Sequence, residues 1–182
     1  MSFDEPFTVT EKIDGAQVGL WITRVVADSP DPENGIGVEV EGQRWVLRPW
    51  SPICWLDGRR DNFGFASWVR ASAAALTLLR AGQHFGIWYG QGISGGYGLD
   101  HRRLALDDAD RWSRVPGYLP DGVEHVPILA HARGLELSAI VDGAMRRLQR
   151  DGSLAVPGQP AHGLEITPQN LRQVRFKVQL RT

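Results

Sequence analysis

Short apolar segments separated by turn residues run through most of the 182-residue chain, and two windows are long enough for helices. The window 63–80 is rich in Ala and Leu and stops before Gly82, and the window 135–150 carries apolar residues on one helical stripe. The strand-like segments are 7–10, 18–25, 84–89, 103–106, 163–166 and 174–180, and 38–47 is predicted as a hairpin with its turn at Gly42. This order predicts an α+β fold with mostly antiparallel sheets flanked by helices.

Length and charge narrow the class of protein further. A chain of 182 residues fits one domain, spanning 1–182. Its 20 basic and 21 acidic residues give a net charge of −1, which excludes a strongly basic nucleic-acid clamp and predicts weak binding of long nucleic acid. The single cysteine, Cys54, excludes an intrachain disulfide and a cysteine zinc cluster. Polar N-terminal residues and the absence of a long apolar run predict a cytoplasmic protein with no membrane partner.

The lysine count points to chemistry. The chain holds 18 arginines but two lysines, Lys12 and Lys177, as a GC-rich coding bias would produce. Arginine replaces lysine as a surface cation, but it cannot replace it as a nucleophile because the guanidinium stays protonated. The two lysines are therefore the first candidates for catalysis, the alternative being chance survival on a solvated face.

Lys12 begins the segment Lys-Ile-Asp-Gly, which follows a predicted strand and precedes a turn at Gly15. A lysine amine in this position can attack an α-phosphate and form a phosphoramidate. Asp14, two residues on in an extended segment, lies on the same face and is predicted to orient the amine or a nucleotide sugar. The alternative for Asp14 is an ordinary turn carboxylate before glycine.

On these residues and four further segments, the chain resembles the ATP-dependent RNA ligases of small phage and bacterial type, within the covalent nucleotidyltransferase superfamily. The segments that carry the resemblance are TEKIDG at 10–15, DNFGFASWV at 61–69, HFGIWYGQGISGGYGL at 84–99, DGSLAVPGQPAHGLEI at 151–166 and FKV at 176–178. The resemblance implies a ligase adenylation-domain fold without an OB domain, ATP or another nucleoside triphosphate, and Mg²⁺. It implies catalytic roles for Lys12, Lys177 and Asp14. It implies cofactor contacts from Glu11, Ile13, Gly15, Phe85, Ile87, Trp88 and Leu164. His162 is a further catalytic candidate, because an imidazole can donate or accept a proton near pH 7.

The chain departs from the family pattern at two acidic positions. Ile87 stands where motif III has a glutamate, and His162 stands where motif IV has one. Glu165 is an odd number of residues further on, so it is expected to face the other side of a strand and not to replace the missing acid. No protein metal ligand is predicted, and Mg²⁺ would rely more on substrate phosphates. His162 is either a proton donor or base, or an ordinary strand-end histidine.

Three functions remain open at this point. The first is a nucleotidyltransferase that forms a Lys12–AMP intermediate and activates a phosphate or other acceptor, an RNA end or a smaller molecule. The second is a degenerate ligase that binds nucleotide or RNA ends without covalent chemistry, and the third is a scaffold. Phe85 and Trp88 suit core packing as well as base contacts, whereas Trp50 and Trp55, if exposed, would suit stacking on bases. Oligomeric state is left open.

Overall fold

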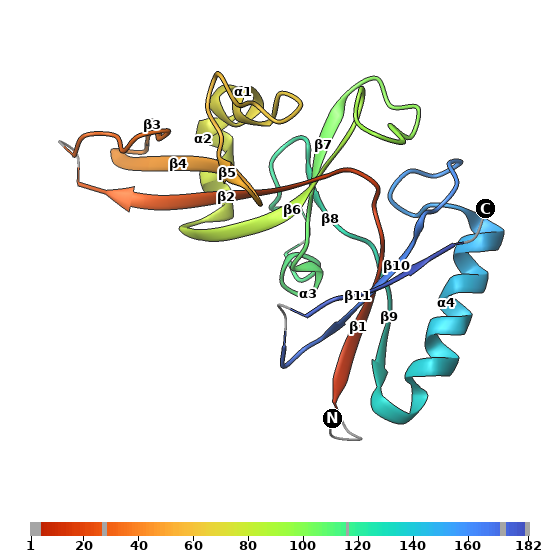
Figure 1. Ribbon diagram of the computed structural model, residues 1–182. Coiled ribbons are helices and arrows are strands. Elements are labelled where there is room, and N and C mark those ends of the chain that lie inside the picture. The colour runs from red at the N-terminus through yellow and green to blue at the C-terminus, as the bar shows by residue number, and fades with distance from the viewer. Residues whose placement is uncertain (1–4, 27–28, 116, 172–173, 181–182) are drawn as a thin grey trace.

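The computed structural model describes residues 5–26, 29–115, 117–171 and 174–180, and two β-sheets organise them (Figure 1). The small sheet has four antiparallel strands in the order β11-β10-β1-β9. These strands are β1 (Pro6–Glu11), β9 (Ile128–Arg133), β10 (Gly163–Pro168) and β11 (Phe176–Gln179).

The large sheet has the order β3-β4-β2-β6-β7-β8, with β5 added on β4. Its strands are β2 (Ala16–Val25), β3 (Ile36–Val40), β4 (Gln43–Ser51), β5 (Cys54–Trp55), β6 (Gly82–Gly90), β7 (Arg102–Leu106) and β8 (Val123–His125). Among the described strands, β7 and β8 form the one parallel pair. The predicted α+β fold with mostly antiparallel sheets is confirmed.

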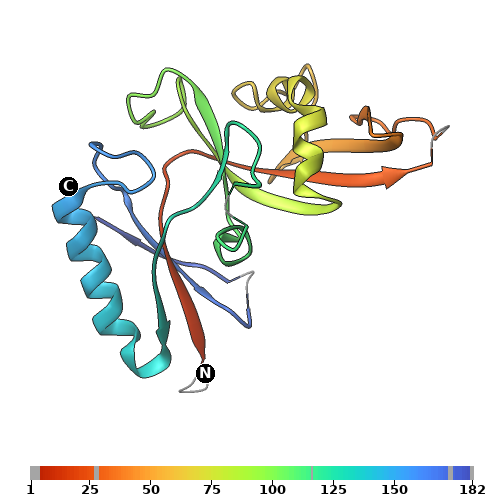
Figure 2. The same ribbon diagram turned by 180° about the vertical axis from the view of Figure 1, so that it is seen from behind.

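Helices cover one face of each sheet. In Figure 2 the helices on the small sheet and those on the large sheet lie on opposite sides of the molecule. Helix α4 (Leu137–Asp151), which follows a 3₁₀ turn at Gly134–Glu136, buries Ala144 and Leu148 against Val9 and Leu164 of the small sheet. Helices α1 (Phe65–Ala71) and α2 (Ala73–Leu76) and the 3₁₀ turn Thr77–Leu79 pack on the large sheet. Within the described residues, no helix has the length and apolar character to span a bilayer.

The helix predicted over 63–80 is corrected at both its start and its middle. Phe63 and Gly64 have φ angles of 57° and 79°, in the left-handed region, so the helix begins at Phe65. Ser72 (φ −102°) then separates α1 from α2. Sequence periodicity also missed β5, β8, β9 and the short helix α3 (Ala109–Trp112). Most of these elements are too short to show a period, and the long-range pairing that defines the strands is not visible locally.

The alternation of β1 sets up the functional region. Phe7 and Val9 point into the core beneath α4, so Thr8 and Thr10 face the opposite side of the small sheet. After Glu11 the chain leaves the small sheet and enters the large one as β2, a passage visible in Figure 1. Residues 12–15 are this crossing, so Lys12 and Asp14 lie where the two sheets meet.

Candidate active site

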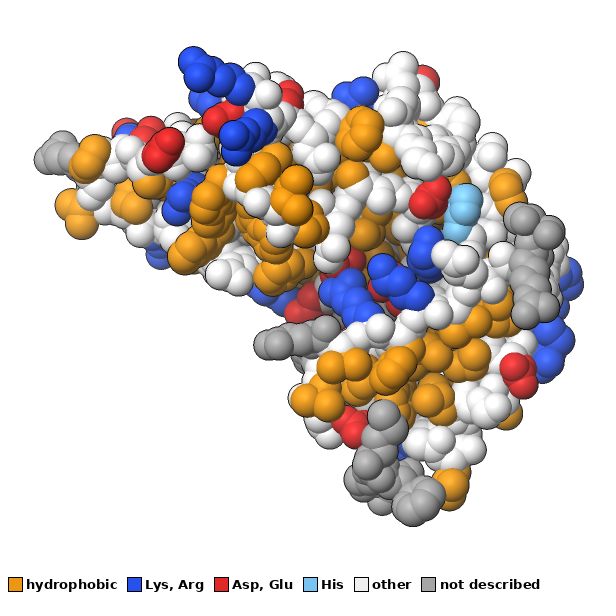
Figure 3. All heavy atoms as spheres, viewed as in Figure 1, with side chains coloured by type: hydrophobic (Ala, Val, Ile, Leu, Met, Phe, Trp, Pro, Cys, Tyr) orange, Lys and Arg blue, Asp and Glu red, His pale blue; other side chains and the backbone are white. Residues whose placement is uncertain are grey.

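A cleft lies between the open face of the small sheet and the large sheet. It contains a pocket of about 270 Å³. The pocket is lined by Thr8 and Thr10 of β1, Gln83 to Phe85 of β6, residues 107–112 around α3, Thr167, Gln169 and Arg175. Figure 3 shows basic and acidic side chains gathered where the part of the molecule built on the small sheet meets the part built on the large sheet. The cleft is therefore polar on one wall and partly aromatic on the other.

Three residues form a row across the small sheet on its cleft side. Thr10 of β1 is paired with Glu165 of β10, and Glu165 is paired with Lys177 of β11. The Glu165 carboxylate lies 3.5 Å from Lys177 Nζ. Glu165 thus faces the cleft, which corrects the expectation that it points away from the site. Lys177 faces opposite to Val178, which packs beneath α4.

Arg175 adds a second cation to this wall. Its guanidinium lies 2.8 Å from Asp107 and 3.6 Å from Glu165. Burial raises the pKa of the Asp107 carboxyl, and the charge of Arg175 opposes that rise. The sequence interpretation missed Arg175, although its spacing of two residues from Lys177 places both on one side of an extended segment.

Lys12 continues the cleft side of β1 just beyond the strand. Its backbone N–H donates to the carbonyl of Gly163 at 3.0 Å, so it still follows the sheet ladder. By alternation from Thr8 and Thr10, its side chain points toward the cleft. Within the described part of the chain, no hydrogen bond or ion pair engages Lys12 Nζ. Lys12 is half-buried, and its amine has no protein partner among the described residues.

Asp14 and His162 are brought together through Tyr97. The backbone N–H of Asp14 donates to the Tyr97 hydroxyl at 2.8 Å, and the His162 ring meets the Tyr97 ring edge-on at 5.3 Å. Burial raises the pKa of Tyr97 to about 12, so its hydroxyl stays neutral. The Asp14 carboxylate also borders Gly95, where a Cβ would approach it to 2.8 Å. The signal for Tyr97 in the sequence was an aromatic residue between glycines.

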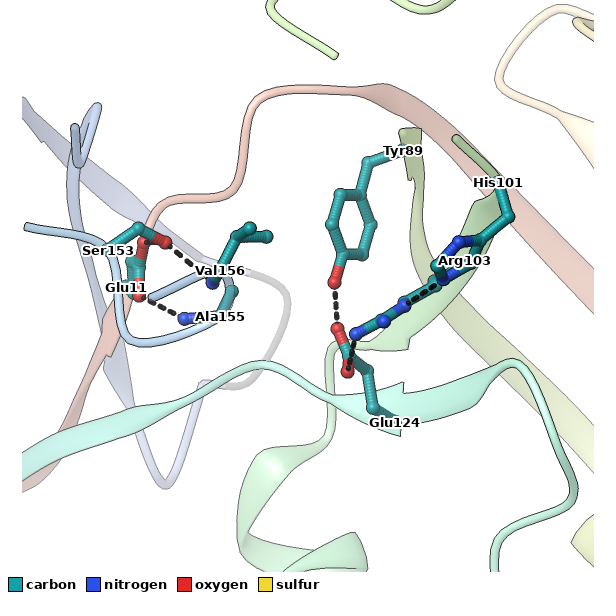
Figure 4. Close-up of polar contacts among 8 residues, drawn as sticks. All are labelled: Glu11, Tyr89, His101, Arg103, Glu124, Ser153, Ala155 and Val156. Atoms are coloured by element: carbon teal, nitrogen blue, oxygen red, sulfur yellow. Dashed lines mark hydrogen bonds and ion pairs between the residues drawn. The ribbon is translucent and has the colours of Figure 1, made fainter. Parts of the chain in front are cut away.

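Glu11, predicted as a cofactor contact, has a structural role in the protein. Its fully buried carboxylate accepts hydrogen bonds from Ser153 Oγ (2.5 Å) and from the backbone N–H groups of Leu154 (2.7 Å) and Ala155 (3.0 Å), as Figure 4 shows in part. These bonds fix the loop before β10 against the end of β1, next to Lys12. The side chain is used entirely within the protein.

Three further side chains assigned to the cofactor lie in the core. Trp88 is 1% exposed, packs on Phe65 and donates its indole N–H to the carbonyl of Phe63. Leu164 packs beneath α4, and Ile13 packs in a cluster at the junction of the two sheets. Strand alternation turns Trp88 and Leu164 away from the cleft, and packing buries Ile13 at the junction of the sheets. The structure thus gives these three side chains a packing role, and their contact with a cofactor stays a prediction.

Three other predicted contacts lie beside the cleft. Phe85 is 39% exposed and lines the pocket. Ile87 lies on the same side of β6, against the crossing segment. Gly15 is required by packing, because a Cβ there would meet the Ile87 side chain at 2.6 Å and the Trp88 carbonyl oxygen at 2.7 Å.

A second polar network stands behind the crossing, on β6, β7 and β8 (Figure 4). The Tyr89 hydroxyl donates to the Glu124 carboxylate, and Arg103 lies 3.7 Å from the same carboxylate. Burial raises the pKa of Tyr89 and keeps it a neutral donor. This network ties β6, which carries Phe85 and Ile87, and β7 to β8, and so holds one wall of the cleft in place.

The described residues include no group of three or more carboxylate, imidazole or thiol side chains arranged to hold a metal ion. In the cleft, Glu165 is already paired with cations and Asp107 is paired with Arg175. The residues present therefore do not form a protein cage for Mg²⁺.

Comparison with known proteins places this geometry in a fold class. No protein-family model matches the chain, and no curated protein matches it. Solved structures that resemble it include RNA ligase from Naegleria gruberi: a variant with ATP and Mn (TM-score 0.54, 20% identity), an apo variant (0.59, 16%) and the ligase with PPi (0.54, 16%). Each match covers 97% of this chain and about half of the ligase chain. The fold is therefore an RNA-ligase-like fold.

Proposed function

We propose that this protein is a ligase-like nucleotidyltransferase whose nucleophile is Lys12. The observation that supports the proposal is the position of Lys12 directly after β1, where its backbone N–H still follows the sheet ladder and no described residue pairs with its amine. Strand alternation from Thr8 and Thr10 directs its side chain to the cleft side. In this reaction Lys12 Nζ forms a bond to the α-phosphorus of a nucleoside triphosphate. The bond to pyrophosphate breaks, and the amine loses a proton to water. An acceptor oxygen then attacks the phosphorus and releases Lys12.

The cations of the cleft fit the charge that develops in this step. Lys177 and Arg175 lie on the wall that Lys12 extends, where they can neutralise phosphate oxygens. Asp14, held by Tyr97 beside the glycine-rich loop, is the candidate to orient the amine or the nucleotide sugar. His162, which contacts the Tyr97 ring, is the candidate proton donor or base.

ATP is the first candidate nucleotide, since similar solved ligase structures hold ATP or AMP together with Mn. Because the described residues of the cleft form no cage for a metal ion, a divalent ion would enter mainly on the triphosphate. The near-neutral charge of the chain favours a short RNA end or a smaller acceptor. With a smaller acceptor, the proposed activity would be one repurposed from the sealing of RNA ends.

A specific observation favours a second candidate, a degenerate ligase that binds nucleotide without chemistry. Ile87 and His162 replace the family's two acids, and the cleft cations Lys177 and Arg175 are already paired with Glu165 and Asp107. Such pairing weakens the binding of a phosphate by these two cations, because each cation must first lose its contact with a carboxylate.

The test is intact-mass spectrometry after incubation with Mg²⁺ and each of the four nucleoside triphosphates. We expect a mass gain of one nucleoside monophosphate in the wild type and none in Lys12→Arg. Lys177→Arg is the matched control, because it removes the chain's other lysine and leaves Lys12 as the one possible lysyl adduct. An adduct that persists in Lys12→Arg would move the nucleophile elsewhere. Nucleotide binding by calorimetry without any adduct would select the second candidate.

A further inference from the structure

An aromatic groove lies on the large sheet, beside the cleft. It has a volume of about 460 Å³ and is lined by Trp21, Trp50, Ser51, Ile53, Cys54, Trp55, Gln83 and Phe85. The rings of Trp21 and Trp55 are stacked, with centroids 6.1 Å apart and planes 24° apart. Ile53 is 92% exposed at its rim. Figure 3 shows hydrophobic side chains gathered over the part of the molecule where β5 lies beside β2 and β6 in Figure 1. A contiguous exposed apolar patch of this kind is typical of a binding surface.

A positive charge lies beside the groove, on Arg48, and none of the residues that line the groove is acidic. The Arg48 guanidinium lies 3.9 Å above the Trp55 ring, and its buried Nε has no hydrogen-bond partner. Among the described residues no carboxylate pairs with Arg48, and none of those lining the groove is acidic. An occupant that satisfies both features has flat aromatic groups and negative charge. This combination is that of a nucleotide unit.

The groove is continuous with the cleft. Gln83 and Phe85 line both hollows, and Phe85 meets Trp50 edge-on at 5.2 Å. A strand whose end lay near Lys12 would therefore pass Phe85 and reach the stacked tryptophans. We infer that the aromatic groove binds unpaired bases of a single-stranded polynucleotide, with Arg48 contacting a backbone phosphate. The inference rests on the proposed function for what enters the cleft, but the binding itself needs no chemistry.

The test is fluorescence anisotropy with a labelled single-stranded RNA and the full-length protein, without nucleoside triphosphate. We expect Trp21→Ala and Trp55→Ala each to weaken binding by about fivefold or more, the usual effect of losing one stacked base. Trp55→Phe retains a stacking ring and is expected to restore most of the affinity. Tyr118→Ala is the matched control, since it removes another exposed aromatic ring with an arginine beside it, Arg80, away from the groove.

Two competitors separate stacking from charge. An abasic sugar-phosphate strand of the same length and a fully paired duplex are both expected to compete poorly with the single strand. Equal competition by either, no measurable binding of the single strand, or groove variants that bind as tightly as Tyr118→Ala would overturn the inference. It would also be overturned if those variants changed only the oligomeric state, measured by sedimentation, since a second copy would then occupy the groove. A protein that forms the Lys12 adduct but fails these tests loses this inference alone. Binding without an adduct counts against the proposed function alone.

Discussion

The carboxylate of Glu165 lies 3.5 Å from the Nζ atom of Lys177, across neighbouring strands on the cleft side of the small sheet. Lys177 is one of two lysines in the chain. Because it pairs with Glu165, its positive charge is partly neutralised before a phosphate binds. A phosphate that binds in the cleft must therefore compete with Glu165 for Lys177.

Glu165→Gln is expected to strengthen nucleotide binding by about two- to fivefold, because it frees Lys177 and Arg175 from a partly exposed ion pair. Isothermal titration calorimetry with ATP at low salt measures the change. Asp100→Asn, which removes an exposed carboxylate paired with His101, is the control and should leave the affinity unchanged. Weaker binding in Glu165→Gln would mean that Glu165 contacts the nucleotide directly.

Glu11→Ala is expected to lower the free energy of unfolding by about 3 kcal/mol or more, since it leaves the buried Ser153 hydroxyl and two half-buried backbone N–H groups without their acceptor. Urea denaturation measures this loss. The same change at the exposed Glu33 should have little effect. A loss at Glu11 no larger than at Glu33 would contradict a structural role for the buried carboxylate.

Gly15→Ala is expected to cost about 1–3 kcal/mol of stability, because the added Cβ meets the Ile87 side chain and the Trp88 backbone. Gly143→Ala is a control of opposite sign. Gly143 lies within α4 with open space around it, so alanine there should stabilise the protein by up to about 1 kcal/mol. Thermal melting of the two variants compares them, and equal shifts would refute the close approach at Gly15.

Tyr97→Phe is expected to slow formation of the proposed lysyl adduct more than it lowers stability. The variant leaves the Asp14 N–H without the acceptor that fixes the segment after Lys12, and it retains the ring that packs on Tyr89 and His162. Adduct formation over time by mass spectrometry, beside a denaturation curve, separates the two effects. An unchanged rate would show that Tyr97 does not position this segment.

His84 predicts a loss of stability in acid. Its ring is buried against Trp112, and burial lowers its pKa below the ordinary value near 6.5. Below that pH the unfolded chain therefore binds more protons than the folded chain, and stability falls as the pH falls. His84→Phe should reduce the change in the free energy of unfolding between pH 7 and pH 5. The same change at the more exposed His131 should leave the part of that pH dependence that is due to His84. Parallel curves for wild type and His84→Phe would contradict this assignment.

Local patterns were enough for much of the architecture. Apolar periodicity placed α4 and most strands within a few residues, because each of these segments carries its own alternation or helical stripe. Short elements such as β5 and α3 were missed, since they are defined by partners far away in the chain. The helix over 63–80 was broken by backbone angles at Phe63, Gly64 and Ser72 that the sequence did not specify.

Several site assignments depended on which way a side chain points. Resemblance named Glu11, Ile13, Trp88 and Leu164 as cofactor contacts, yet the structure buries all four. It also turns Glu165 into the cleft. A motif fixes the order of residues along the chain, but the register of the paired strands decides which of them share a face.

The sequence by itself determined the fold class and the candidate nucleophile, because strand periodicity is local and because a chain with two lysines offers few amines for chemistry. The tertiary structure alone decided that Glu165 pairs with Lys177, that Tyr97 links Asp14 to His162, and that Phe85 joins the cleft to the aromatic groove. Each of these relationships joins segments far apart in the chain. Sheet pairing and core packing bring these segments within contact distance, and a local sequence pattern contains no information on such long-range contacts.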